Sequence, residues 1–166
     1  MKILLVTIFP PDIGGPATQA SDLCRSLAAE GVDPVVVTFD RQRSYRDTYN
    51  GIPVHRLHFP RSKERSLVGA ISGYVRFAYR LNQIIRSERP DVIHCNSMGG
   101  YASIVALEAR LNSVPSVVKF ASDLVWEIRN RRRLTNETIE QAHRAGLSAR
   151  MLVVYERIVL RLFTLV

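Results

Sequence analysis

Short, uninterrupted apolar runs alternate with amphipathic helical patterns along this chain, and that alternation limits its fold more than any other feature. Residues 2–8 (KILLVTI) and 34–39 (PVVVTF) are apolar on both faces, which is typical of strands buried in a parallel sheet. Between them, residues 16–31 repeat Ala, Leu and Cys at helical spacing and end at a glycine. This unit predicts an α/β fold: a Rossmann-like parallel sheet with helices on both faces.

The alternation continues further along the chain. Three more strands are expected, the first of them less apolar and nearer a sheet edge, over residues 52–59, 91–95 and 115–121. Helices are expected over residues 67–88 and from Gly99 and Gly100 to about Leu111. The first should bury one apolar stripe, made of Leu67, Ile71, Tyr74, Val75, Ala78, Leu81 and Ile85.

The remaining segments have less regular patterns. Residues 40–51 and 60–66 are polar and basic and are predicted to be loops. Residues 136–163 are mostly helical in pattern, with a break near Gly146 and Ser148 as the cap of the second piece. The final FTLV resembles the opening of another strand. With no internal repeat or linker, residues 1–166 are expected to form one domain.

The charge balance is strongly basic. Lys and Arg number 23 against 15 acidic residues, a formal charge of +8, which favours anionic partners. Nucleic acid is disfavoured, because the basic loops have few aromatic residues and no nucleic-acid motif is present. The main basic positions have two interpretations: they are solvated surface residues, or they contact an anionic membrane. These positions are Arg41, Arg43, Arg46, Arg61, Lys63, Arg65, Arg129, Arg131, Arg132 and Arg133.

The cysteines and histidines form no metal-binding pattern. Cys24 and Cys95 are far apart in sequence and are expected to be reduced core residues of an intracellular protein. No secretory signal and no apolar run of transmembrane length is visible. We therefore expect a cytoplasmic protein without a metal or other cofactor. It could also bind the inner face of the membrane as a peripheral protein.

Ligands of parallel α/β sheets bind beyond the carboxyl ends of the strands, so the loops at those ends are the candidate sites. Gly14 and Gly15 lie between the first strand and the first helix. Without a Cβ they let a ligand approach the backbone, and a helix N-terminus attracts phosphate. The alternative is a simple turn, since the segment has neither G-x-G-x-x-G nor a Walker lysine.

Two more loops offer polar groups at the same edge. Asn96 and Ser97 either face the ligand or cap the helix that follows, and Gly100 either lines the site or packs closely on the sheet. His94 is expected to be a hydrogen-bonded core residue. Asp123 either caps a helix through Trp126 or hydrogen-bonds a sugar or acceptor hydroxyl, with general-base catalysis as its catalytic role.

Two residues near Asp123 complete this segment. Glu127 could pair with nearby arginines, and Trp126 is expected in the core. The candidate site is made up of six residues: Gly14, Gly15, Asn96, Ser97, Asp123 and Glu127.

In order and spacing, these segments resemble the amino terminus of family 4 glycosyltransferases. The resemblance rests on the strand and glycine-pair loop at the start, EGVDPVVVT at 30–38, RPDVIHCNS at 89–97 and VPSVVKFASDLVWE at 114–127. Members of this family are retaining enzymes with the GT-B fold, which pairs two Rossmann-like domains. Ala121 stands where many members have a histidine, and Ser122 replaces a glycine, so no histidine role is carried over.

The resemblance implies an acceptor-binding half of a glycosyltransferase that moves a sugar from a nucleotide diphosphate sugar to a saccharide or lipid-linked acceptor. It implies that Gly14 and Gly15 contact donor phosphate or acceptor, and that Asn96, Ser97 and Asp123 line the acceptor side. Glu127 is a further candidate for binding donor phosphate or acceptor. It also implies a separate carboxy-terminal donor domain, because the chain ends where the last strands of the first domain should begin. Alone, the chain is expected to be inactive, and an exposed core face would favour a homodimer.

Two other functions stay open at this point. A non-enzymatic Rossmann-like module could bind a protein partner or an anionic membrane through its arginines. A nucleotide-dependent enzyme of another type, such as a dehydrogenase, is disfavoured by the missing G-x-G-x-x-G.

Overall fold

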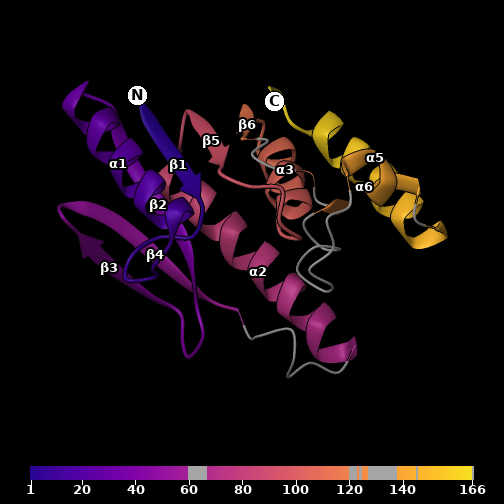
Figure 1. Cartoon of the computed structure of the whole chain (residues 1–166). Coiled ribbons are helices and arrows are strands. Elements are labelled where there is room, and N and C mark those ends of the chain that lie inside the picture. The colour runs from indigo at the N-terminus through magenta and orange to yellow at the C-terminus, as the bar shows by residue number, and fades with distance from the viewer. Residues whose placement is uncertain (60–66, 120–122, 124, 127–137, 145, 166) are drawn as a thin grey trace.

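In the computed structural model, a six-stranded sheet lies between helices on its two faces (Figure 1). The structure describes residues 1–59, 67–119, 123, 125–126, 138–144 and 146–165. The strands are β1 (Lys2–Val6), β2 (Asp33–Asp40), β3 (Tyr45–Tyr49), β4 (Ile52–His58), β5 (Val92–Cys95) and β6 (Ser116–Val118). The helices are α1 (Gly15–Ala29), α2 (Leu67–Glu88), α3 (Ala102–Leu111), α5 (Ile139–Arg144) and α6 (Leu147–Leu162).

The strand order is β3-β4-β2-β1-β5-β6, and all pairs are parallel except β3 with β4. This confirms the predicted Rossmann-like α/β fold. Successive residues of β1 point to opposite faces, as the strand repeat requires. Leu5 packs with Cys24 of α1 on one face, while Leu4 packs with Leu81 of α2 and Val105 of α3 on the other.

The prediction that residues 40–51 form a loop is wrong. They contain β3, which makes an antiparallel hairpin with β4 through the two-residue turn Asn50–Gly51. Both turn residues have positive φ, 49° and 82°, as this tight hairpin requires. β3 therefore forms the sheet edge, and β4 lies next to it, in agreement with the prediction that this strand is nearer an edge.

The predicted bounds of α2 are confirmed, but its predicted apolar stripe is partly wrong. Ile71 and Val75 are 57% and 63% exposed. The helix is turned so that its buried face carries Phe77, Leu81, Ile84 and Ile85. Phe77 contacts Phe39, Phe59 and Tyr101, and this aromatic cluster fixes the rotation of the helix.

The carboxy-terminal part follows the expected pattern with one correction. The break at Gly146 between α5 and α6 is confirmed, but Ser148 is not the cap. Gly146 itself is the N-cap of α6, with φ of 113° and no side-chain hydrogen bond. Leu165 forms a parallel bridge with Val117, so the last residues lie beside β6, consistent with the expected opening of a strand.

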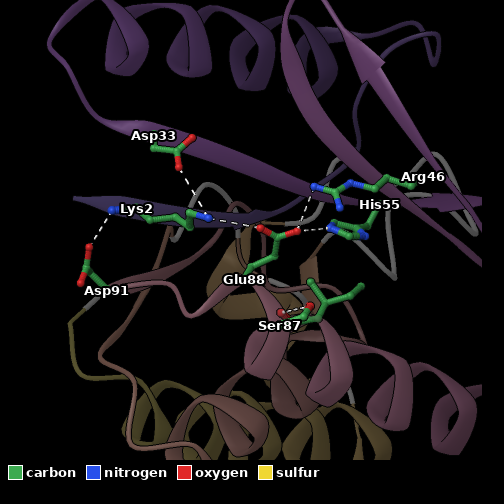
Figure 2. A network of polar contacts seen from close by, with 8 residues as sticks. Lys2, Asp33, Arg46, His55, Ser87, Glu88 and Asp91 are labelled. Atoms are coloured by element: carbon green, nitrogen blue, oxygen red, sulfur yellow. Dashed lines mark hydrogen bonds and ion pairs between the residues drawn. The ribbon is translucent and has the colours of Figure 1, made fainter.

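A polar network crosses the α2-covered face of the sheet (Figure 2). The carboxylate of Glu88, at the end of α2, contacts Lys2 Nζ at 3.3 Å, Arg46 at 3.2 Å and His55 Nε2 at 2.9 Å. Lys2 also lies 3.6 Å from Asp33. The network joins the end of α2 to β1, β2, β3 and β4, and it lies apart from the glycine loop.

Candidate functional site

The glycine loop connects β1 to α1 at the carboxyl edge of the sheet. Gly14 is the N-cap of α1, and its carbonyl accepts N–H bonds from Ala17 and Thr18 at 3.1 Å. No side chain caps this helix, and its first turn contains no acidic residue. The helix N-terminus therefore keeps its partial positive charge available for an anion.

The fold requires glycine at position 14 but not at position 15. Gly14 has φ of +143°, a conformation that residues with a side chain rarely adopt, so the turn itself requires glycine there. A Cβ at Gly15 would meet nothing within 4 Å, and its φ is ordinary. The fold therefore gives no reason for glycine at position 15, whereas a ligand that approaches the backbone would.

A buried arginine holds this loop in place. Arg56 of β4 is only 3% exposed and donates to the carbonyl of Pro10 at 2.8 Å and to Oδ2 of Asp47 at 3.0 Å. The backbone N–H of Thr48 and the Arg56 guanidinium together lower the pKa of Asp47. The sequence analysis missed Arg56, although a charged residue in an apolar strand was a visible signal.

The exits from β1 and β5 are locked together by Asn96. Its backbone N–H donates to the carbonyl of Val6 at 3.1 Å, and its side-chain amide donates to Oγ1 of Thr7 at 3.2 Å. Asn96 is 7% exposed. It lies at the expected edge, but its amide nitrogen is engaged within the protein, and it does not cap α3.

Ser97 also has a partner within the protein. Its hydroxyl lies 2.7 Å from the hydroxyl of Tyr101, whose pKa burial raises far above its usual value. The predicted capping of α3 by Ser97 or Asn96 is wrong, because Tyr101 is the N-cap and no side chain caps the helix. Gly100 packs against α2 rather than on the sheet: a Cβ there would lie 2.9 Å from Oη of Tyr74.

Lys119 brings a cation to the same edge. It follows β6, its backbone N–H donates to the carbonyl of Cys95, and its ammonium group donates to Oε1 of Gln19 in α1 at 2.9 Å. Half-buried His94 lies nearby, and burial together with the charge of Lys119 lowers the pKa of its imidazole. Positive charge from Lys119 and from the α1 N-terminus thus gathers beside the glycine loop, and the sequence analysis did not assign Lys119.

Asp123 is largely buried beyond the end of β6. Its Oδ1 accepts the backbone N–H of Trp126 at 2.8 Å, the capping contact foreseen as one of its two roles. Its Oδ2 lies 2.6 Å from Nε2 of His143 in α5, a partner that the sequence analysis did not find. Trp126 is 36% exposed, so its expected place in the core is wrong. Glu127 lies outside the described residues.

Among the residues that the structure describes, no three side chains of His, Cys, Asp or Glu gather closely enough to hold a metal ion. None of the described helices combines the length and the apolar character that a membrane crossing demands.

A family model for the glycosyl transferase 4-like domain matches residues 14–166. A curated relative, GDP-mannose:cellobiosyl-diphosphopolyprenol alpha-mannosyltransferase of Xanthomonas oryzae pv. oryzae (strain PXO99A), is 28% identical over 127 residues. That match covers 71% of this chain and 30% of the relative, so the chain spans less than a third of that protein's length.

Solved structures share the fold at low sequence identity. Sucrose-phosphate synthase of Thermosynechococcus elongatus matches 93% of this chain and 39% of its own, with a TM-score of 0.57 and 13% identity. UDP-GlcNAc 2-epimerase of Methanocaldococcus jannaschii matches 94% of this chain and 37% of its own, with a TM-score of 0.55 and 15% identity. One is a synthase and one an epimerase, so these likenesses support the GT-B fold and carry no reaction with them.

Proposed function

The chain belongs to the glycosyl transferase 4-like domain family, and on this premise we propose that it is the acceptor-binding half of a retaining glycosyltransferase. The complete enzyme would move a sugar from a nucleotide diphosphate sugar to a saccharide or lipid-linked acceptor. The donor is a substrate, and the proposal needs no metal or other cofactor. A carboxy-terminal domain would hold most of the nucleotide.

The observation that carries this proposal is the open glycine loop beside two sources of positive charge. Gly15 exposes backbone without a structural need for glycine, next to the uncapped N-terminus of α1. Lys119, which follows β6, contacts the first turns of the same helix by donating to Oε1 of Gln19. As the sugar leaves, negative charge grows on the diphosphate, and fixed amides and cations stabilise that charge without reorganising.

The other candidate residues receive different parts in this proposal. Asn96 shapes the acceptor side by joining the loops after β1 and β5 through its contact with Thr7, and Ser97 does so through its contact with Tyr101 within the loop after β5. Asp123 belongs to the acceptor side as well, with its carboxylate engaged by Trp126 and His143. Glu127 is kept as a candidate for binding donor phosphate or acceptor.

Peripheral contact with an anionic membrane fits a lipid-linked acceptor. Four residues of α6 form one exposed apolar stripe: Leu147, Met151, Val154 and Ile158, each more than half exposed. Exposed Arg150, Arg157 and Arg161 lie on the same helix. An apolar stripe with basic neighbours is the composition of a helix that lies in a membrane interface. This contact would place the protein at the cytoplasmic face of a membrane.

Sugar transfer by the complete enzyme tests the proposal. This chain joined to a carboxy-terminal donor domain should turn over a nucleotide sugar such as GDP-mannose, the donor in the name of the mannosyltransferase relative. Gly15→Val should lower kcat/KM by at least about tenfold, because the new side chain blocks approach to the loop while the fold accommodates it. Equal turnover with folding unchanged would remove the glycine loop from the mechanism.

A further inference from the structure

An aspartate and a histidine from separate segments meet beyond the carboxyl end of β6. Oδ2 of Asp123 lies 2.6 Å from Nε2 of His143, and Oδ1 accepts the N–H of Trp126. The side chain of Asp123 is 10% exposed and that of His143 is 32% exposed. The carboxylate is therefore fixed at both oxygens and shielded, while the imidazole reaches the solvent.

The carboxylate decides which ring nitrogen of His143 carries the proton. An ionised carboxylate can only accept hydrogen bonds, so Nε2 must hold its hydrogen in this contact. A neutral imidazole then has a lone pair on Nδ1 and can accept a hydrogen bond there. Among the described residues, the hydrogen bond of the His143 ring is the one between Nε2 and Asp123. The pair thus presents an oriented acceptor on a partly exposed ring.

We propose that His143 accepts a hydrogen bond at Nδ1 from a hydroxyl group of the sugar acceptor, with Asp123 as the residue that positions it. This inference rests on the proposed function, which places a hydroxyl-rich ligand at this edge. The contact is a hydrogen bond only, and no covalent bond forms or breaks at the histidine. In this proposal Asp123 is a positioning residue and not a general base. Its carboxylate sets the tautomer of His143, and the imidazole contacts the ligand.

The tautomer can be tested without any enzymatic activity. In Asp123→Asn, the amide oxygen still accepts the N–H of Trp126, but the amide NH2 group faces Nε2, which must then become the acceptor. Long-range ¹H–¹⁵N NMR spectra of the histidine rings should show the hydrogen on Nε2 in the wild-type chain and on Nδ1 in this variant. Glu140→Gln, on the same helix, should leave the tautomer unchanged. A wild-type ring with its hydrogen on Nδ1 would overturn the inference.

The ligand contact is tested with cellobiose, the disaccharide unit in the acceptor of the mannosyltransferase relative. Cellobiose should shift the Nδ1 signal of His143 together with the backbone amides of Asn96 and Lys119. His143→Phe keeps a ring but has no lone pair, so it should weaken cellobiose binding about three- to tenfold, while Glu140→Gln should not.

The remaining outcomes separate the two proposals. If cellobiose shifts the amides of Asn96 and Lys119 but not the ring, and His143→Phe binds equally well, the role of His143 is overturned and the proposed function stands. If cellobiose shifts nothing at this edge, acceptor binding by this chain fails, and the role of His143 falls with it.

Discussion

Nε2 of His55 lies 2.9 Å from Oε1 of Glu88, so an inner strand of the sheet is joined directly to the last residue of α2. Lys2 and Arg46 contact the same carboxylate (Figure 2). Burial alone would raise the pKa of Glu88, but hydrogen bonds from His55 and Lys2 and the charge of Arg46 outweigh it. The pKa of Glu88 therefore lies below its ordinary value.

This lowered pKa predicts a pH-dependent contribution of Glu88 to stability. A carboxyl with a depressed pKa in the folded state stabilises the fold above its unfolded pKa, about 4.3, and loses that effect as the pH falls through the folded value. Glu88→Gln should lower the free energy of unfolding by about 1–3 kcal/mol at pH 7. The difference from wild type, measured by urea denaturation, should shrink below about pH 4.

The exposed Glu140→Gln serves as the control, because it removes a carboxylate of α5 outside this network. Its unfolding free energy should follow wild type at both pH values. A Glu88→Gln deficit of equal size at pH 7 and pH 3 would contradict the role of the ionised carboxylate.

The same substitution should destabilise the protein at Gly14 but not at Gly15. Gly14→Ala forces a side chain into φ of +143° and should cost about 1–3 kcal/mol of stability. Gly15→Ala adds a Cβ to open space and should change stability by less than about 0.5 kcal/mol. Thermal unfolding of both variants measures the difference, and equal destabilisation would show that position 15 is also a structural glycine.

The order of strands and helices could be predicted because β-branched runs and helical spacing are local properties. The hairpin of β3 with β4 had a local signal too, the Asn50–Gly51 pair, but the polar strand before it was interpreted as a loop. The face of α2 that is buried had no local signal. Ile71 and Val75 are as apolar as its core residues, and only packing of Phe77 against other aromatic rings selects the rotation.

For the candidate site, too, the positions of the residues could be predicted from the sequence but the partners of their side chains could not. Gly14, Asn96 and Asp123 follow strands, so their place at the carboxyl edge could be inferred from sequence. The partners of their side chains could not, because the contact of Asp123 with His143 spans 20 residues and that of Asn96 with Thr7 spans 89. Such pairs form only when separate elements pack, and no residue spacing in the sequence predicts them.

Removing the guanidinium of Arg56 should loosen the glycine loop. Arg56→Met keeps an unbranched apolar chain at this buried position but leaves the carbonyl of Pro10 and the carboxylate of Asp47 without this donor. The fold should lose about 1–3 kcal/mol. Backbone amides of residues 12–15 should exchange hydrogen faster than in wild type, because the loop loses its tether to β4.

Asp47→Asn separates the two contacts of Arg56. Asp47 has 40% side-chain exposure, so this variant should cost much less stability than Arg56→Met and leave exchange in residues 12–15 unchanged. Faster exchange in both variants to the same extent would show that the Asp47 contact, rather than the Pro10 carbonyl, fixes the loop.

The exposed stripe of α6 predicts binding to anionic lipid. In sedimentation with vesicles, the chain should bind those containing phosphatidylglycerol at low salt and bind pure phosphatidylcholine much less, because basic residues on α6 contribute about 1 kcal/mol each near an anionic surface. Met151→Glu with Val154→Glu adds two negative charges to the stripe and should weaken binding at least about tenfold. The matched control is Gln42→Glu with Thr48→Glu, which adds the same charge at the opposite edge of the sheet. Both residues are exposed; Gln42 precedes β3 and Thr48 lies in it. Equal loss in both double variants would assign the binding to net charge alone, and no binding by the wild-type chain at low salt would remove the membrane from the proposed function.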